Sequence, residues 1–314
     1  MLREALLFLS DSRLARRFAT GAPLARTVAR RFVAGETIDD AVSAARELNA
    51  AGTTVSLDYL GESVRSREEA RAAADVYLRL LDRMEEDGIR GNISLKLTQL
   101  GQDIDEAFVR ENVLRVLDRA AGYGRFVRFD MESSAYTRRT LDLAYALHAD
   151  GHENLGAVIQ SYLHRSEDDV RELNRRRIGV RLCKGAYKEP PSIAYQAKRE
   201  VDENFIRLMR MLLAEGNHPG IATHDEAMIR ATKRFAEERG IPTSSFEFQM
   251  LYGVRRDVQR RLVADGYDLR IYIPFGGAWY PYLMRRLAER PANVFFIVNS
   301  VLREGLGARD GRRR

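Results

Sequence analysis

The chain has 314 residues, of which 45% are apolar and 31% charged, and its formal net charge is +6. This length suits one large α/β barrel of about 250 residues, and the composition excludes long disordered stretches and, with one cysteine (Cys183), an intrachain disulfide. No apolar run approaches the ~20 residues of a membrane-spanning helix, and no aromatic-basic alternation predicts a nucleic-acid partner.

Residues 1–52 are predicted to form a helical N-terminal arm. Apolar residues recur at helical spacing from Leu6 to Phe18 and again from Leu24 to Phe32. Thr37 is followed three residues later by Asp40, which is the pattern of a capped helix start, and it predicts a third helix through Ala50.

From residue 53 onward, short β-rich runs alternate with long amphipathic helices, which indicates parallel strands joined by right-handed crossovers. Eight such units, with no Gly-rich phosphate loop after the first strand, favour a closed (β/α)8 barrel of the TIM type over an open dinucleotide-binding sheet. We predict the barrel over residues 53–300 and a basic, solvated tail over residues 301–314. The predicted strands are Thr54–Tyr59, Asn92–Leu97, Phe126–Glu132, Gly156–Gln160, Gly179–Lys184, Gly220–His224, Phe246–Leu251 and Leu269–Pro274.

Polar residues interrupt these strands, mostly near their C-terminal ends. Parallel barrel strands are buried on both faces and should be nearly all apolar. The C-terminal strand ends of a barrel converge on one mouth, where active sites lie, so Lys96, Asp130 and Arg181 should come within reach of one another. A purely structural salt-bridge network is the alternative, but more strands contribute polar ends than structure requires. The polar residues at or near strand ends are Lys96, Asp130, Glu132, Gln160, Arg181, Lys184, Thr223, His224, Gln249 and Tyr272.

Metal-binding and hydrolase motifs are missing from the sequence. It contains no His-Glu-x-x-His, no paired cysteines and no Gly-x-Ser-x-Gly. His148 and His152 are four residues apart but separated by a glycine at a helix end, which is typical of a surface pair. We therefore predict no metal, and the polar set favours an organic anion or a cofactor.

At these positions the chain resembles the proline dehydrogenase family. The resemblance spans roughly residues 53–300 and rests on six segments found in order. These are Ser94-Leu95-Lys96-Leu97-Thr98-Gln99-Leu100-Gly101, Arg128-Phe129-Asp130-Met131-Glu132, Gln160-Ser161-Tyr162-Leu163, Arg181-Leu182-Cys183-Lys184-Gly185-Ala186-Tyr187, Ala222-Thr223-His224, and Tyr272-Ile273-Pro274-Phe275-Gly276 with the later Tyr282-Leu283-Met284-Arg285-Arg286-Leu287-Ala288-Glu289.

The resemblance implies FAD as cofactor and oxidation of L-proline to Δ1-pyrroline-5-carboxylate, with reoxidation by a membrane quinone. The length is expected to exclude the bifunctional form of the family, and Trp279-Tyr280-Pro281 fits the single-function bacterial branch better.

The resemblance also implies the substrate contacts. Arg285 and Arg286 would hold the proline carboxylate, because an arginine can bind a planar carboxylate with two hydrogen bonds. An ordinary basic helix face is the alternative for these two residues. Lys96 would be the third cation, and Tyr272 would pack beside the substrate ring.

Two residues are expected to serve the reaction itself. Asp130 is expected to pair with Lys96 in the free enzyme and to help set the protonation of the substrate amine, although the sequence leaves open whether it is a base. Arg181 would lie near the reactive edge of the flavin. By resemblance, the FAD contacts are Met131, Gln160, Arg181, Lys184, Gly185, Ala186, Tyr187, Thr223 and His224.

Two other functions were weighed. Another flavin barrel oxidoreductase, such as one like methylenetetrahydrofolate reductase, would share the cofactor but would not need adjacent arginines. A non-enzymatic basic binding protein would need neither Lys96 nor Asp130. The single cysteine indicates a reducing, cytoplasmic location, and the arginine-rich arm or tail suggests peripheral binding to an anionic membrane on its inner face.

Overall fold

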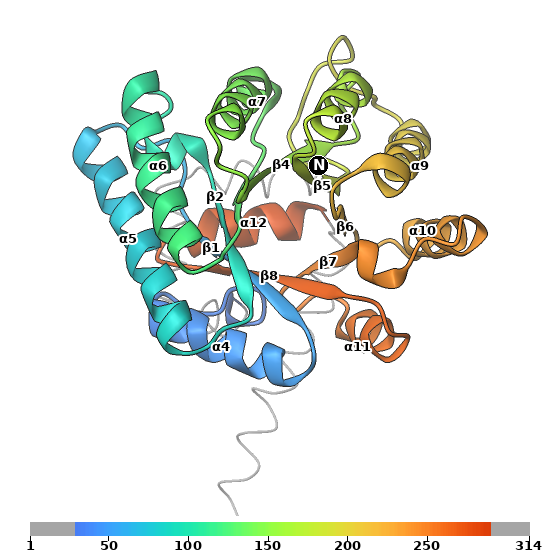
Figure 1. Cartoon of the computed structure of the whole chain (residues 1–314), viewed down its shortest axis with the longest axis horizontal. Helices are drawn as coiled ribbons and strands as arrows, with labels where there is room; N and C mark the ends of the chain where they lie inside the picture. The colour runs from blue at the N-terminus through green and yellow to red at the C-terminus, as the bar shows by residue number, and fades with distance from the viewer. Residues whose placement is uncertain (1–28, 290–314) are drawn as a thin grey trace, which may run out of the picture.

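The computed structural model describes residues 29–289, without the side chains of residues 285–289. Eight parallel strands pair in sequence order and close into a barrel when β8 pairs with β1 (Figure 1). The predicted (β/α)8 fold is therefore confirmed. The strands are β1 (Thr54–Tyr59), β2 (Gly91–Leu95), β3 (Val127–Phe129), β4 (Leu155–Gln160), β5 (Gly179–Cys183), β6 (Gly220–Ala222), β7 (Glu247–Leu251) and β8 (Leu269–Phe275).

A ring of helices covers the outside of the barrel (Figure 1). Several begin where a side chain accepts the hydrogen bond of a free backbone N–H; for example, Ser66 caps α5 and Asp105 caps α6. The ring consists of α5 (Arg67–Glu86), α6 (Glu106–Gly122), α7 (Ser134–Ala149), α8 (Ser166–Arg175), α9 (Lys198–Glu215), α10 (Glu226–Glu238) and α11 (Arg256–Ala264), with short 3-10 turns at η1 (Leu97–Leu100) and η2 (Thr243–Ser245).

The helix before β1 completes this ring. α4 (Ile38–Ala50) starts at Thr37, whose hydroxyl accepts the Asp40 N–H while the Asp40 carboxylate accepts the Thr37 N–H, so the predicted capped start is confirmed. It packs against β1, β8 and α5. The two helices predicted between Leu6 and Phe32 lie wholly or mostly outside the described residues, and the division at residue 52 stays a prediction.

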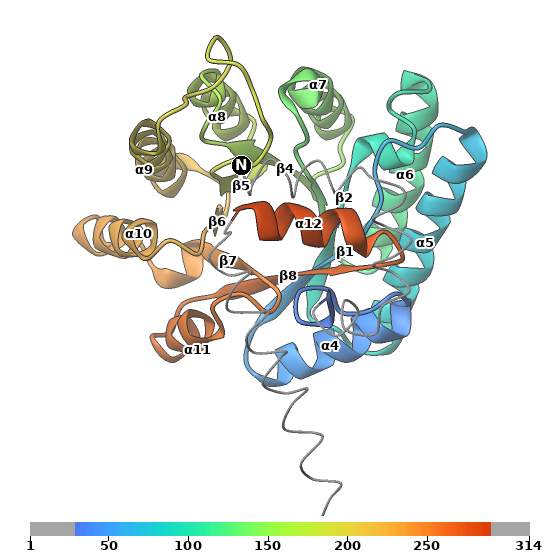
Figure 2. The same cartoon turned by 180° about the vertical axis from the view of Figure 1, so that it is seen from behind.

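The helix after β8 takes a different place. α12 (Trp279–Glu289) begins four residues after the end of β8 and lies across one end of the barrel, as Figure 2 shows. Since it directly follows β8, this end carries the C-terminal ends of the strands. α4 therefore packs between β8 and β1, where a barrel's last helix usually lies, and α12 covers the mouth instead.

Four strands end earlier than predicted, among them β2 at Leu95 and β5 at Cys183. β3 ends at Phe129 and β6 at Ala222, so Asp130, Thr223 and His224 lie just beyond their strands. The outward-facing strand residues, such as Leu57 and Ile93, are fully buried against the helices.

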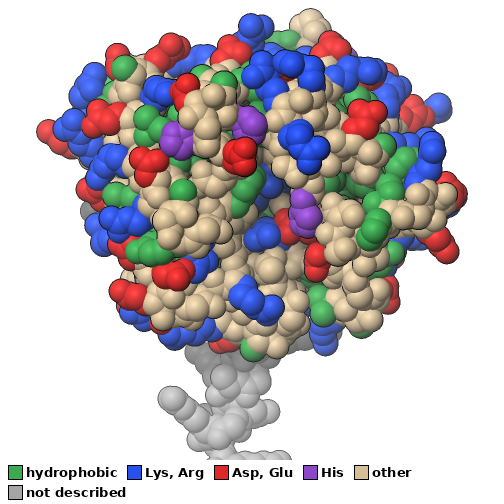
Figure 3. Space-filling view, in the orientation of Figure 1, with side chains coloured by type: hydrophobic (Ala, Val, Ile, Leu, Met, Phe, Trp, Pro, Cys, Tyr) green, Lys and Arg blue, Asp and Glu red, His purple; other side chains and the backbone are tan. Residues whose placement is uncertain are grey.

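Figure 3 shows the end of the barrel that lies opposite α12, where acidic and basic side chains are intermixed over the surface.

Candidate active site

The polar residues at the strand ends meet inside the mouth of the barrel. Asp58 lies one residue before the end of β1, Lys96 and Asp130 directly follow β2 and β3, and Arg181 and Tyr272 lie within β5 and β8. The parallel pairing brings these positions to one level, as the sequence predicts.

Asp130 is the centre of this group. One carboxylate oxygen accepts a hydrogen bond from Arg181 Nη1 at 2.7 Å, and the other accepts one from the Tyr272 hydroxyl, also at 2.7 Å. The Arg181 guanidinium lies 5.2 Å from the centre of the Tyr272 ring. Both Asp130 and Arg181 are buried, so this arrangement is shielded from solvent on most sides.

The principal partner of Lys96 is Asp58, which the sequence analysis did not select. Lys96 Nζ lies 3.1 and 3.2 Å from the two Asp58 oxygens but 3.9 Å from Asp130. The expected ion pair between Asp130 and Lys96 is present, but it is longer than the pair that Lys96 makes with Asp58. Asp58 lies on β1 and contacts Lys96, which directly follows the adjacent strand β2. An aspartate within an otherwise apolar strand could have identified Asp58 as a site residue from the sequence.

Burial and neighbouring charge shift the pKa values of this group. Burial raises the pKa of Asp58 above its ordinary value, and the Lys96 charge opposes that shift. Burial alone would lower the pKa of Lys96, but the Asp58 and Asp130 charges raise it above its usual range. Burial also raises the pKa of Tyr272 well above 10, with Asp130 adding to the effect. At neutral pH Lys96 is a cation and Tyr272 a hydrogen-bond donor.

Three of the predicted FAD contacts lie on the β4 and β6 sides of the mouth. Gln160 is 3% exposed, and its amide oxygen has no hydrogen-bond partner among the described residues. His224 accepts the Leu251 N–H at Nε2, which leaves Nδ1 as the protonated nitrogen of the neutral ring. Thr223 is buried, and its hydroxyl accepts the Asp225 N–H.

Lys184 and Gly185 follow β5. Lys184 Nζ donates to Asp225 at 2.8 Å and also to Asp202, so two carboxylates already balance its charge. Gly185 has a φ of +101°, and a Cβ there would lie 2.2 Å from the Tyr162 ring. A glycine is needed at this position for the left-handed backbone and for the close ring.

The remaining predicted contacts differ in burial. Met131 is buried directly after Asp130, Ala186 is exposed and Tyr187 is half-buried. Arg285 and Arg286 lie in α12 across the mouth, but their side chains are outside the described part of the structure.

A second set of buried charges lies deeper in the barrel and was not predicted as a group. Arg270, near the start of β8, donates to both Glu247 oxygens at 2.7 and 2.9 Å and to the Val55 carbonyl. Arg128 donates to the Gly179 carbonyl at 2.6 Å and makes no ion pair within the described residues. Burial, with the Arg181 charge, lowers the pKa of Arg128 to about 9. We call Arg128, Glu247 and Arg270 the floor group and Asp58, Lys96, Asp130, Arg181 and Tyr272 the mouth group.

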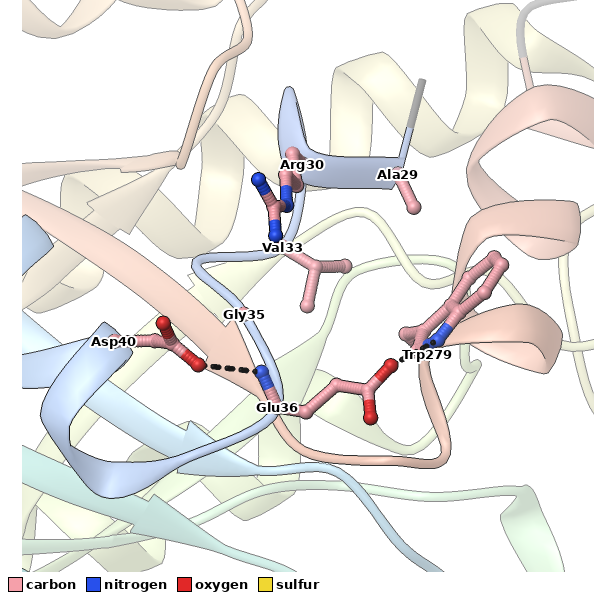
Figure 4. A pocket seen from close by; sticks show the side chains of 7 residues that line it. All are labelled: Ala29, Arg30, Val33, Gly35, Glu36, Asp40 and Trp279. Atoms are coloured by element: carbon pink, nitrogen blue, oxygen red, sulfur yellow. Dashed lines mark hydrogen bonds between the residues drawn. The ribbon is translucent and has the colours of Figure 1, made fainter. Parts of the chain in front are cut away.

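A cavity of about 250 Å³ lies elsewhere, between the segment before α4 and the start of α12 (Figure 4). Glu36 accepts the Trp279 indole N–H at 3.1 Å on its wall, and Asp40 accepts the Glu36 N–H. Its lining includes none of the mouth group.

Residues 29–289 contain neither a cluster of metal-ligating side chains nor a membrane-spanning helix. No group of three or more histidine, cysteine or acidic side chains there is placed to hold a metal ion. None of the helices in residues 29–289 is long and apolar enough to cross a membrane.

The fold and the mouth group together define the chain as a (β/α)8-barrel enzyme with a charged site at the C-terminal strand ends. A model of the family described as proline dehydrogenase matches residues 41–299. The chain belongs to the proline dehydrogenase family of oxidoreductases.

Curated relatives agree with this assignment. Proline dehydrogenase 1 of Bacillus subtilis is 40% identical over 304 residues, covering 97% of this chain and all of that protein. Proline dehydrogenase of Deinococcus radiodurans is 41% identical, covering 88% of this chain and 90% of that one. The bifunctional protein PutA of Escherichia coli is 30% identical, and the match covers 87% of this chain but only 24% of PutA.

A solved structure shows the same barrel. Proline utilization A from Bdellovibrio bacteriovorus, inactivated by N-propargylglycine, superposes with a TM-score of 0.78 at 28% identity. The match covers 84% of this chain and 32% of that protein. The family assignment favours proline dehydrogenase activity over the other flavin-barrel hypothesis and over a non-enzymatic binding protein.

Proposed function

We propose that this chain catalyses the FAD-dependent oxidation of L-proline to Δ1-pyrroline-5-carboxylate by hydride transfer to the flavin. The observation that carries the proposal is the mouth group, in which Lys96, Arg181 and Tyr272 surround Asp130 beneath α12 in a barrel of the proline dehydrogenase family.

The substrate carboxylate would be held by cations from two elements. Lys96 stays charged because the two carboxylates beside it raise its pKa. Arg285 and Arg286 are neighbours on α12, and adjacent helix residues point about 100° apart, so they would contact the carboxylate from different directions. A carboxylate held from both the strand ends and α12 would orient the ring between them.

Asp130 and Tyr272 would fix the other side of the substrate. The Tyr272 hydroxyl is anchored on Asp130, so its ring is held in one orientation and can pack against the pyrrolidine ring. The amine must be neutral for its lone pair to assist loss of hydride from the adjacent carbon. A carboxylate near the amine favours the protonated form, and the Arg181 and Tyr272 hydrogen bonds to Asp130 reduce that effect by spreading its charge.

The residues present fit FAD. The Gln160 amide oxygen is buried without a partner in the described structure and would accept a hydrogen bond from the flavin ring, and His224 would lie beside the cofactor. When bound, FAD supplies the acceptor for the hydride that leaves the substrate. Met131, Arg181, Lys184, Gly185, Ala186, Tyr187 and Thr223 would complete the cofactor site.

A membrane quinone is the proposed electron acceptor, and the proposed location is the cytoplasm, with peripheral binding to the inner face of the cell membrane. Family membership supports the quinone, and the arginine-rich ends of the sequence support the membrane contact. Co-sedimentation with anionic liposomes tests the contact: trimming residues 1–28 and 301–314 should abolish it, and unchanged sedimentation would refute it.

An anaerobic spectrum of the purified protein tests the reaction. L-proline should bleach the flavin band near about 450 nm, whereas D-proline and glycine should leave it unchanged. A protein that cannot be loaded with FAD, or whose flavin stays oxidised with L-proline, would contradict the proposal.

A further inference from the structure

One glutamine connects the mouth group to the floor group. The Gln249 side-chain oxygen accepts a hydrogen bond from Arg181 Nε, and its nitrogen donates to Glu247 Oε1 at 2.6 Å. Glu247 in turn is held by two hydrogen bonds from Arg270. A continuous chain of side chains therefore runs from Arg270 through Gln249 to Arg181 and Asp130.

The strand geometry leaves room for this side chain. Gln249 is 3% exposed, and a Cβ placed on Gly220 would lie 2.2 Å from its amide nitrogen. The Gln249 amide thus occupies the space that any larger residue at position 220 would fill. β6 and β7 are adjacent, with Gly220 paired to Glu247 and Ala222 to Gln249.

Glu247 determines which way round the amide lies. An amide has one accepting end and one donating end, and a carboxylate can only accept. Glu247 therefore binds the Gln249 nitrogen, and the oxygen must face Arg181. The Arg270 ion pair keeps Glu247 ionised: burial would raise its pKa, but the Arg270 charge and hydrogen bonds bring it below its ordinary value.

Gln249 completes the binding of the Arg181 guanidinium. Nη1 donates to Asp130, and Nη2 donates to Ser94 at 3.0 Å and to Ser56 at 3.2 Å. Nε has Gln249 as its hydrogen-bond partner. Rotation of the guanidinium would break several of these bonds together, so its orientation over the Tyr272 ring is determined from the floor as well as from the mouth.

We propose that Gln249 is a positioning residue for the reaction: it holds Arg181 in the orientation that the site uses, and Glu247 with Arg270 fixes Gln249. The proposal rests on the proposed function, since it assigns Arg181 to the flavin edge. Gln249 itself would touch neither substrate nor cofactor.

The test replaces Gln249 with an apolar side chain of similar length. Gln249→Met in the FAD-loaded protein should lower the anaerobic rate of flavin reduction at saturating proline by about tenfold, since a charged hydrogen bond is lost and the guanidinium can rotate. The flavin midpoint potential should fall, because a cation held near the ring favours its reduced form. The KM for proline should stay within about twofold.

Asn174→Leu is the matched control. Asn174 is a buried residue on α8, and its side-chain amide donates to the Met211 carbonyl on α9. Both helices belong to the outer ring, outside the mouth group. The Asn174→Leu substitution should lower the free energy of unfolding without changing the flavin reduction rate or the flavin midpoint potential. A Gln249→Met protein with the reduction rate and potential of the wild type would overturn the proposal.

A second variant and a second readout keep the test independent of how Gln249→Met folds. Gly220→Ala should displace the Gln249 amide without changing its chemistry, and it should also lower the flavin reduction rate and midpoint potential.

The NMR signal of Arg181 Nε–H in the wild type is a second readout, and its absence from Arg181→Lys identifies it. This proton should exchange slowly with water. Exchange as fast as that of surface arginines would refute the contact with Gln249. If the wild type does not oxidise proline at all, the proposed function fails, whereas an active wild type with unaffected variants refutes this inference alone.

Discussion

The mouth group and the floor group are both buried and charged, but their partners differ. At the floor, Arg270 binds both oxygens of one carboxylate and a backbone carbonyl, and Arg128 binds backbone carbonyls. At the mouth, the partners are side chains from five strands or strand ends. Asp130 accepts hydrogen bonds from Arg181 and Tyr272, and the Lys96 ammonium lies 3.9 Å away.

Under the proposed function, this difference separates structural charges from functional ones. Arg128 binds strand carbonyls, and Arg270 and Glu247 bind each other from adjacent strands, so the floor charges are satisfied wherever the barrel forms. The mouth side chains depend on one another, and each can be rearranged by a ligand that offers a carboxylate or an amine. Burial of charge alone therefore does not mark an active site in this barrel.

The largest expected effect comes from Asp130→Asn. Asparagine has one accepting atom and cannot serve both Arg181 and Tyr272, so both would lose their orientation. We expect kcat/KM for proline to fall by about two orders of magnitude. Asp103→Asn, at an exposed carboxylate that accepts the Tyr136 hydroxyl, is the control and should change little. Near-normal kinetics for Asp130→Asn would remove the mouth group from the reaction.

At the floor, Arg270→Met should instead reduce stability. It leaves Glu247 buried without its ion-pair partner, which costs about 3–5 kcal/mol. Urea denaturation of the FAD-loaded protein measures this, with Arg115→Met on the surface as control. We expect kcat/KM of the folded variant to fall by no more than the roughly tenfold expected for Gln249→Met, since Arg270 acts on Arg181 only through Glu247 and Gln249. If Arg270→Met kept the stability of the wild type but its kcat/KM fell well beyond that limit, the floor group would not differ from the mouth group in its role.

Glu132, beside the mouth, should show a pH-dependent effect. Burial raises the pKa of Glu132 from 4.5 to about 6, although hydrogen bonds from Thr98 oppose the shift. Its contribution to stability is therefore fully present below 4.5 and is lost as pH rises through 6.

Glu132→Gln removes this titration. Relative to the variant, the wild type should lose about 2 kcal/mol of unfolding free energy between about pH 4 and about pH 8. Denaturation curves across that range measure it, and Glu203→Gln at an exposed position is the control. A constant difference between wild type and Glu132→Gln would mean that Glu132 keeps its ordinary pKa.

The smallest effect is expected on the surface. Arg138 and Asp142 form an exposed ion pair 3.0 Å long on α7, with side chains 75% and 54% exposed. Arg138→Ala should change the unfolding free energy by no more than about 0.5 kcal/mol. Thermal denaturation measures this change. A loss of unfolding free energy as large as that of Arg270→Met would mean that burial does not decide the difference between the Arg138–Asp142 and Arg270–Glu247 ion pairs.

Much of the fold could be predicted from alternating patterns along the chain. The eight strands were placed to within a few residues, and the predicted Thr54–Tyr59 matches β1. Lys96, Asp130 and Arg181 were expected to meet because parallel strand ends converge, and they do.

What was missed depends on contacts between strands. Asp58 was read as part of a strand, and only the register of β1 with β2 shows it against Lys96. The floor group was missed because Arg128 reaches the Gly179 carbonyl past Gly156, and because Gln249, which joins this group to Arg181, lies against Gly220 on the adjacent strand. Gly156, Gly179 and Gly220 lie at or near the starts of three consecutive strands. This pattern in the sequence could have indicated that large side chains cross the barrel at that level.

The sequence by itself determined the order of strands and helices, the level of the polar residues along each strand and the family, because these depend on local spacing and on short motifs. Tertiary structure decided which carboxylate binds Lys96, that α4 packs between β8 and β1, and that α12 lies across the mouth. These outcomes depend on barrel closure and on the exact register between strands, which bring residues more than a hundred positions apart into hydrogen-bond distance, as with Tyr272 and Asp130.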